Sequence, residues 1–390
     1  MRLLHTSDWH LGRKIRRESR QPECERVLAE VTRIVRDESI DVVVIAGDTF
    51  DSLSPGAEAE RLAYETLGEI VRDGAQVVMI AGNHDSPHHM DALTSILRMV
   101  GVHTVGSVPE QAEDAIIAVP SRNRSETATF AALPWVPERI ALQFETLFEG
   151  ADNARTEYRQ VMEALIPRCF SRFSDDTINV FVGHMLIDGS EIGEGGGERK
   201  LHIGHNFAVN AGCIPATAHY VALGHVHKRQ AIVAQSPTFY AGSLLQLDFG
   251  EGGQKKYVNV VDAKPRQPAD IRPIEITGGR GLQTVTLDFD DLTSHAGKYG
   301  DDYLRVIVRA DRPLPSLFEQ VREVLPNALD VAFERTDESA QTASDASKHG
   351  LAPYELLARY YRERHSAEAP EALIALFNEL YEAEAGHAPA

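Results

Sequence analysis

The chain has 390 residues, 43% hydrophobic and 25% charged, with a formal net charge of −19. Its length exceeds what one hydrophobic core usually holds, so we expect two or three domains. No apolar run approaches the roughly 20 residues that a membrane span needs, and the start lacks a secretory signal. Three scattered cysteines, Cys24, Cys169 and Cys213, argue against a disulfide framework and a thiolate zinc site. We therefore expect a cytoplasmic protein. The acidic balance argues against a large phosphate-binding surface but does not exclude nucleic acid, because basic residues can gather on one face.

Strands and helices alternate in the first hundred residues. Apolar periodicity predicts three strands and three helices, with strands over 2–6, 41–46 and 76–81 and helices over 22–38, 56–73 and 90–100. Such alternation is typical of βαβ units and a mostly parallel sheet. The chain from 115 to 262 reads mainly as strands, with one helix over 151–169. Two sheets of a sandwich, covered by the early helices, would accommodate both parts. A proline-rich stretch at 263–273 then predicts a domain boundary, so the first domain is residues 1–273.

The remaining chain predicts a second domain and a tail. Residues 274–335 indicate a small α+β domain with no evident catalytic cluster. Residues 336–350 are small and polar and predict a flexible linker. The amphipathic pattern of residues 351–390 predicts a helical tail. The linker favours docking of this tail onto another chain, and the alternative is a helix pair folded back on its own domain.

Apolar runs in this sequence end repeatedly in glycine and then a metal-type ligand. The four ligands that follow such a glycine are Asp48, Asn83, His184 and His225. Asp8 ends a fifth run, in which serine replaces glycine. His10 and His227 follow two residues after Asp8 and His225, so an extended chain would place each pair on one face. Glycine permits a sharp turn at a strand end and a close approach of the backbone to a metal. The pattern predicts ligands collected at one edge of a sheet.

Seven ligands are too many for a single metal that must also bind substrate and water. Carboxylates, an amide and imidazoles without thiolates suit manganese, iron or zinc. Asp48, central in the set, would bridge two ions about 3.5–4 Å apart, the usual geometry for hydrolysis of phosphate esters. His84 follows the ligand Asn83 and would protonate the leaving oxygen or bind the transition state, and Asp85 would orient its ring.

The motifs D-x-H, G-D-x-x-D, G-N-H-D, G-H and G-H-x-H occur here in this order, beginning at Asp8, Gly47, Gly82, Gly183 and Gly224. This set resembles the calcineurin-like metallophosphoesterase superfamily, which implies a four-layer α/β/β/α core, here with a small capping domain and a helical tail. The segments that carry a narrower resemblance, to the bacterial SbcD family of nuclease subunits, are residues 5–12, 46–51, 81–86, 220–227 and 240–243.

The SbcD resemblance implies a manganese-dependent DNA nuclease with 3′-to-5′ exonuclease and endonuclease or hairpin-opening activity. It implies two Mn²⁺ ions per subunit, which Mg²⁺ or Zn²⁺ can replace in a crystal, and a nucleoid-associated role in DNA end processing and repair. It also implies a homodimer, built on the outer sides of the helices near 57–72 and 90–100, and an SbcC-type ATPase partner with long coiled coils.

The resemblance also divides the site residues. One ion would take Asp8, His10, Asp48 and His227, and the other Asp48, Asn83, His184 and His225. His84 matches the catalytic histidine. The chain departs from archaeal and eukaryotic relatives at Asp51, where they carry a histidine, so a direct role in the transition state is in doubt at this position.

Two alternatives stay open for the function. The same metal site would serve a phosphodiesterase or phosphatase for a small phosphorylated molecule, although such an enzyme needs neither the second domain nor the tail. A silent scaffold is disfavoured because every ligand is present. The five basic residues that would contact DNA, or else form a solvated surface, are Arg13, Lys14, Arg16, Arg17 and Arg20.

Overall fold

A computed structural model describes residues 1–108, 115–137, 154–192 and 208–336, with isolated positions between 357 and 377. Most of the expected linker and tail lies outside the described residues. None of the helices in the described part of the chain is long and apolar enough to cross a membrane.

The first sheet has six strands in the order β14-β13-β1-β4-β5-β6. Strands β1, β4, β5 and β6 run parallel to one another, as the βαβ pattern predicted. Strands β13 and β14 are antiparallel to their neighbours. The strand bounds are β1 Arg2–Thr6, β4 Val42–Ile45, β5 Gln76–Ile80, β6 Val102–Val105, β13 Lys256–Asp262 and β14 Asp270–Ile276.

The second sheet also has six strands, in the order β11-β12-β10-β9-β8-β7. Its centre is parallel, from β12 through β10 and β9 to β8. The strand bounds are β7 Ile116–Pro120, β8 Thr127–Leu133, β9 Ile178–His184, β10 Tyr220–Gly224, β11 Gln230–Ile232 and β12 Thr238–Tyr240.

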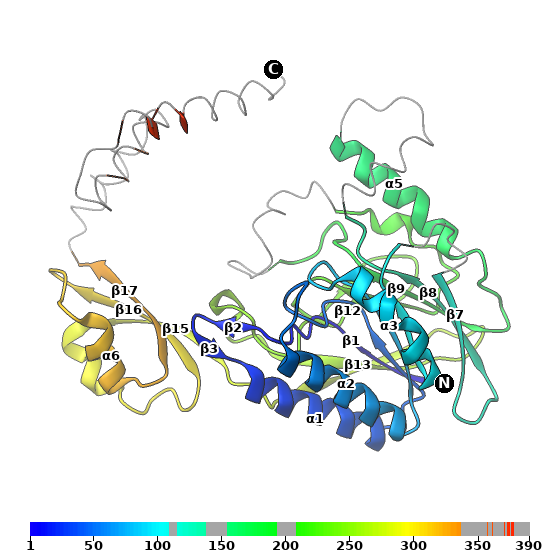
Figure 1. Cartoon of the computed structure of the whole chain (residues 1–390), viewed down its shortest axis with the longest axis horizontal. Helices are drawn as coiled ribbons and strands as arrows, with labels where there is room; N and C mark the ends of the chain where they lie inside the picture. The colour runs from blue at the N-terminus through cyan, green and yellow to red at the C-terminus, as the bar shows by residue number, and fades with distance from the viewer. Residues whose placement is uncertain are drawn as a thin grey trace.

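The two sheets stack face to face around an apolar core, which contains Val44 and Val78 from the first sheet and Phe130 and Val180 from the second. Three helices cover the outer face of the first sheet, and α5 covers the second (Figure 1). This arrangement confirms the expected four-layer α/β/β/α core. The helix bounds are α1 Gln21–Asp37, α2 Ala57–Arg72, α3 Pro87–Met99 and α5 Ala154–Cys169.

Helix α3 begins three residues earlier than its apolar stripe predicted. Pro87 occupies the first turn, where its missing N–H is not needed, and the Ser86 hydroxyl accepts a hydrogen bond from the backbone N–H of His89 at 3.4 Å. The helix therefore starts directly after the segment that carries Asn83 and His84.

The proline-rich stretch at 263–273 is not a domain boundary. It contains the turn between β13 and β14, and Pro273 lies in β14 opposite Asn259. A proline is tolerated there because β14 is the edge strand of its sheet and needs no N–H on its outer side. The first sheet therefore ends at Ile276, three residues beyond the expected boundary.

Residues after this sheet form a separate small unit, with three parallel strands in the order β15-β16-β17 and one helix (Figure 1). Its bounds are β15 Leu282–Asp288, β16 Tyr303–Ala310, α6 Leu317–Val324 and β17 Ala328–Arg335. A short hairpin from the first domain, β2 Lys14–Ile15 and β3 Glu18–Ser19, reaches it, and Ile15 packs against Leu282 and Tyr303.

Arg20 is wholly buried at this junction, so its expected contact with DNA is wrong. Its guanidinium makes two hydrogen bonds to Glu23, at 2.5 and 2.8 Å, and a third to the Gln246 carbonyl at 2.8 Å. It also lies 5.5 Å from the Tyr303 ring centroid. Of the other four basic residues, Lys14, Arg16 and Arg17 are exposed, and Arg13 is partly buried beside Asp51 at 3.0 Å.

We expect Arg20→Met to lower the free energy of unfolding by about 3 kcal/mol, because it leaves the buried Glu23 carboxylate without its cation. Urea denaturation measures this loss. The control is Arg17→Met, an exposed position where we expect a change within about 0.5 kcal/mol. Equal stabilities of the two variants would contradict the structural role of Arg20.

A buried histidine lies in the core between the sheets. His5 of β1 contacts the Tyr220 hydroxyl of β10 at 2.8 Å. Burial is the main cause that lowers its pKa to about 3, and the Arg229 charge lowers it further. Because the folded pKa lies below the unfolded value of about 6.5, protonation favours the unfolded chain. The contribution of neutral His5 to stability is therefore complete above pH 6.5 and is lost as the pH falls toward 3.

We expect His5→Gln to flatten the decline of stability below pH 6.5. The wild-type free energy of unfolding should fall more steeply than that of the variant, by up to about 1.4 kcal/mol per pH unit. Urea denaturation in EDTA at pH 6.5, 5.5 and 4.5 tests this. Exposed His88→Gln is the control, and parallel curves for wild type and His5→Gln would contradict the prediction.

Candidate metal centre

The candidate site lies where the carboxyl ends of strands from both sheets meet. The segments after β1 and β4 are joined by a hydrogen bond from the Asp8 N–H to the Gly47 carbonyl at 3.0 Å. The segment after β10 joins them through the His225 N–H, which donates to the Asp8 carboxylate at 3.1 and 3.2 Å. The run-glycine-ligand pattern thus brings residues of both sheets to one edge.

Two of the run-ending glycines are required by close packing. Gly47 has φ +91°, and a Cβ there would lie 2.3 Å from His184 Nδ1. A Cβ on Gly224 would lie 1.9 Å from the Ala46 carbonyl oxygen. Any side chain at either position would push the two sheets apart at the site.

Four of the expected ligands have unusual backbone conformations. The φ angles of Asp8, His10, Asp48 and His225 are 52°, 47°, 51° and 102°. Non-glycine residues rarely adopt positive φ, and such strain persists where the surrounding structure enforces it, commonly at functional sites. All four residues lie within four residues of the end of β1, β4 or β10.

The structure brings six of the seven expected ligands together in two groups of three, with Asp48 between them. In the first, ligand atoms of Asp8, His10 and His227 lie within 4.8 Å of one another. In the second, the Asn83 amide oxygen lies 3.1 Å from His184 Nε2 and 3.0 Å from His225 Nδ1.

Asp48 lies between the two groups. Its Oδ2 atom is 3.7 Å from His10 Nε2 and 3.4 Å from His184 Nε2, and the side chain is 2% exposed. This position suits a carboxylate shared by two ions.

The donor set fits divalent metal ions. His10 Nε2 is buried and has no hydrogen-bond partner among the residues that the structure describes, although a buried imidazole nitrogen normally has one. Carboxylate, amide and imidazole donors suit divalent ions of the manganese-to-zinc series. We therefore assign this edge of the two sheets as a divalent metal site.

The electrostatics of the site favour positive charge. Burial opposes a charged imidazole, yet the Asp48 carboxylate raises the pKa of His184 to about 9. Burial would likewise raise the pKa of Asp48, but His184, His10 and His84 together hold it well below its usual range. Asp48 is thus a carboxylate at any pH at which the protein works.

His84 lies beside Asp48, and its side chain is partly exposed. Its backbone N–H donates to Asp48 Oδ1 at 2.8 Å, and its Nδ1 lies 3.0 Å from the Asp51 carbonyl oxygen. Because a carbonyl only accepts, Nδ1 carries the proton, and Nε2 is the nitrogen available to a substrate. An atom of this ring also lies within 4.8 Å of donors from His10 and Asp48.

The sequence predicted that Asp85 orients the His84 ring, and this prediction is wrong. Its carboxylate accepts hydrogen bonds from the backbone N–H groups of Gly82 and Phe50, each at 2.9 Å, and of Thr49 at 3.2 Å. Burial and then the Asp48 charge raise its pKa to about 6. Asp85 therefore ties the segment carrying Asn83 to the segment carrying Asp48.

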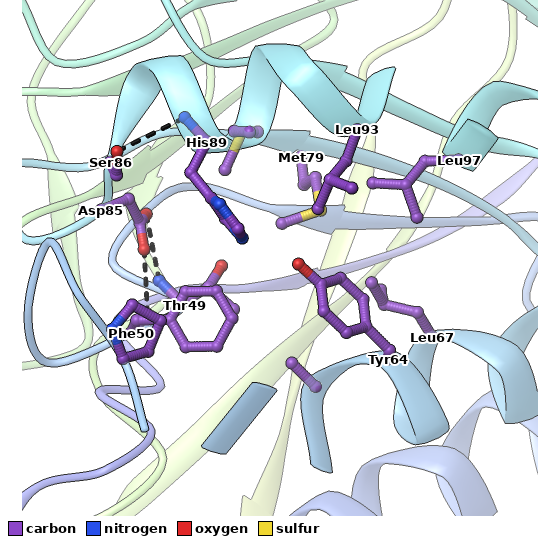
Figure 2. A pocket seen from close by; sticks show the side chains of 13 residues that line it. Thr49, Phe50, Tyr64, Leu67, Met79, Asp85, Ser86, His89, Leu93 and Leu97 are labelled. Carbon is purple, nitrogen blue, oxygen red and sulfur yellow. Dashed lines mark hydrogen bonds between the residues drawn. The ribbon is translucent and has the colours of Figure 1, made fainter. Parts of the chain in front are cut away.

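This tie forms one end of an apolar pocket between α2 and α3, where Asp85 faces the backbone of Thr49 and Phe50 (Figure 2). Leu67 from α2 and Leu93 from α3 line the opposite end. The segments that carry Asp48 and Asn83 therefore line one pocket together with α2 and α3.

Sequence reasoning missed the carboxylates that contact the histidines from behind. Asp51 Oδ1 lies 3.2 Å from His10 Nδ1, and Glu251 Oε1 lies 2.9 Å from His227 Nδ1. Asp51 belongs to the G-D-x-x-D motif, so its spacing was a usable signal. Glu251 lies 24 residues after His227, and no local pattern marks it. Trp135 was also missed, and its ring stacks on His225 with centroids 5.2 Å apart.

Comparison with known proteins agrees with this geometry. A model of the calcineurin-like phosphoesterase family matches residues 1–229, and a model described as a type 5 capsule protein repressor C-terminal domain matches residues 279–365. The chain is 37% identical to the SbcD subunit of the nuclease SbcCD from Bacillus subtilis over 286 residues, 72% of this chain and 71% of that one.

Two further relatives carry the same name. The SbcD protein from Rhodobacter capsulatus is 29% identical over 399 residues, covering 96% of this chain and 94% of its own. The SbcD protein from Escherichia coli K12 is 27% identical over 307 residues, covering 77% and 74%. With its family model matching more than half of the sequence and its ligands gathered at one sheet edge, the chain belongs to the calcineurin-like phosphoesterase family and, within it, to the SbcD proteins.

Proposed function

We propose that this chain is the nuclease subunit of an SbcCD-type complex and hydrolyses phosphodiester bonds of DNA with two bound Mn²⁺ ions. The observation that carries the proposal is the pair of ligand groups sharing Asp48, in a chain whose relatives are named nuclease subunits. Oxygen and imidazole donors without thiolates are compatible with Mn²⁺.

The residues of the site would have two roles, metal binding and proton donation. Asp8, His10 and His227 would hold one ion, Asn83, His184 and His225 the other, and Asp48 both. Two divalent ions held by these residues would supply an activated water and offset the negative charge of the phosphate. As an imidazolium, with its Nδ1–H donated to the Asp51 carbonyl, His84 would give its Nε2 proton to the leaving oxygen and be left as the neutral ring.

The test is Mn²⁺-dependent cleavage of a labelled DNA hairpin and a blunt duplex, with and without an SbcC-type partner and ATP. We expect hairpin opening and 3′-to-5′ shortening of the duplex. Hydrolysis of bis-p-nitrophenyl phosphate without any DNA cleavage would favour the small-molecule phosphodiesterase instead. No hydrolysis of any of these substrates would overturn the enzyme assignment.

We also propose a homodimer formed through α3. Three apolar side chains at the end of this helix are exposed: Ile96 by 65%, Met99 by 87% and Val100 by 54%. An exposed cluster of this kind is typical of a protein interface. Light scattering should give twice the chain mass of 43.0 kDa, and Met99→Glu should give the monomer. A wild-type chain that stays monomeric at micromolar concentration would overturn the dimer.

We further propose that residues 282–335 cap the nuclease domain and that residues 351–390 dock onto the coiled coil of the SbcC-type partner. The support for docking is the amphipathic pattern of the tail after a polar linker. Deleting residues 340–390 should abolish co-purification with the partner while leaving Mn²⁺-dependent cleavage of a small substrate unchanged. Retained partner binding would refute the role of the tail.

A further inference from the structure

The Glu251 carboxylate connects a predicted metal ligand to a buried lysine. Its Oε1 lies 2.9 Å from His227 Nδ1, and its Oε2 lies 2.7 Å from Lys256 Nζ. The side chains of His227, Glu251 and Lys256 are 7%, 2% and 6% exposed. Three ionisable groups are thus enclosed in one line behind the site.

The Lys256 ammonium group donates hydrogen bonds to further acceptors besides Glu251. Its Nζ also donates to the Ser243 hydroxyl at 2.9 Å and to the His227 carbonyl at 3.0 Å. The backbone N–H of Leu247 donates to Glu251 Oε2 at 3.2 Å. The carboxylate is therefore held from one side by the lysine and by the backbone, and its second oxygen is directed at the imidazole.

This arrangement determines which nitrogen of His227 carries a proton. A carboxylate beside an ammonium group only accepts hydrogen bonds, so His227 Nδ1 must be the donor. The lone pair of the neutral ring is then on Nε2, the atom that would coordinate an ion with Asp8 and His10. Histidine ligands of metals are commonly oriented in this way by a carboxylate, and loss of that carboxylate typically costs 10–100-fold in metal affinity.

The two ligand groups differ in what stands behind their histidines. His10 has the same kind of support as His227, from Asp51 and its partner Arg13. His184 of the other group has the neutral carbonyl of Ala46 at 2.8 Å from its Nδ1. Both histidines of one group are thus backed by a carboxylate paired with a cation, and His184 is not.

The segment that carries Glu251 is braced by the second domain. Glu251 ends a short 3₁₀ helix, Phe249–Glu251, and Phe249 packs against the cluster of Leu282 and Tyr303. The Leu282 N–H donates to the Gln246 side chain at 2.7 Å. The position of Glu251 is therefore determined by contacts far from the site in the sequence.

We propose that Glu251, held by Lys256, is a positioning residue that sets the tautomer and orientation of His227 and thereby the affinity of one of the two metal ions. The inference rests on the metal centre of the proposed function. Burying a charged pair is costly, and apolar residues of similar volume would often fill such a place equally well. An ion pair that only stabilised the fold would not require a hydrogen bond between Glu251 Oε1 and His227 Nδ1, and this hydrogen bond is present.

The test counts Mn²⁺ ions bound to the full chain by electron paramagnetic resonance during a titration. The variant is Glu251→Gln with Lys256→Met, which removes both charges and leaves neither one buried alone. We expect two ions on the wild type. On the double variant we expect one ion at wild-type affinity and the other weakened about 10–100-fold.

A matched control lies one residue away. Lys255 and Glu275 form an exposed ion pair at 3.0 Å, and Lys255→Met with Glu275→Gln removes the same two charges. This control should bind both ions as the wild type does. Unchanged affinity for both ions in the Glu251 variant, or equal loss of both, would overturn the role of Glu251.

Two further outcomes remain decisive. If the double variant shows no cooperative thermal transition, Glu251→Asp keeps both charges but withdraws the carboxylate from His227, and it should still weaken one ion by about tenfold. Full affinity in Glu251→Asp would then overturn the proposal. A wild-type chain that binds no Mn²⁺ would overturn the metal centre itself. This result differs from unchanged binding in the variants, which would overturn only the role of Glu251.

Discussion

Asp48→Asn should weaken binding of both Mn²⁺ ions and lower the rate of hairpin cleavage by more than about 100-fold, beyond the loss typical of residues that only support a ligand. The reason is the position of its carboxylate, 3.7 Å from His10 Nε2 on one side and 3.4 Å from His184 Nε2 on the other. An amide keeps the shape and an acceptor for the His84 N–H but loses the negative charge that two cations would share.

Electron paramagnetic resonance of bound Mn²⁺ and a hairpin-cleavage assay measure the two effects. The control is Asp73→Asn, a carboxylate at the end of α2 that pairs with exposed Arg36 at 3.0 Å. This control should match the wild type in both measurements. Loss of only one ion from Asp48→Asn would show that Asp48 belongs to a single group and does not bridge.

His84→Ala should slow hydrolysis by about 10²–10⁴-fold while both ions stay bound, because a positioned general acid typically contributes that much. The ring is partly exposed, and its Nδ1 is occupied by the Asp51 carbonyl, which leaves Nε2 for the leaving group. Single-turnover cleavage at saturating Mn²⁺ isolates this chemical step from metal binding.

His89→Ala is the matched control for His84. His89 is exposed, lies five residues further along the chain, and its ring contacts Glu60 at 3.1 Å. Its removal should leave the rate unchanged. If His84→Ala lost an ion as well as activity, the ring would be a ligand, as its distance from His10 and Asp48 also permits.

Much of this molecule was readable from local pattern. The apolar periods predicted β1 over its observed bounds and α1 and α2 to within one residue at each end. The pattern of apolar run, glycine or serine, and ligand predicted that five residues would meet, because parallel strands end at a common edge. The i, i+2 spacing added His10 and His227 to this set. These inferences succeed since strand alternation, helix periodicity and glycine at a strand end are properties of short segments.

The errors arose where a residue's role depends on distant partners. Arg20 looked like part of a basic surface, but Glu23, Gln246 and Tyr303 enclose it. Asp85 looked like the partner of its neighbour His84, but its carboxylate turns to the backbone of the preceding motifs. The stretch before Pro273 looked like a boundary, yet it pairs with a strand of the first sheet.

The sequence by itself determined the α/β class, the order of the ligand motifs and the family, because each depends on short segments whose chemistry is local. Only the tertiary structure decided which groups stand behind those ligands. Asp51 and Glu251 reach His10 and His227 across 41 and 24 residues of chain, and the second domain braces Glu251 from further still. Hydrogen bonds between distant segments follow from how the layers pack, and no period or spacing in one segment specifies that packing.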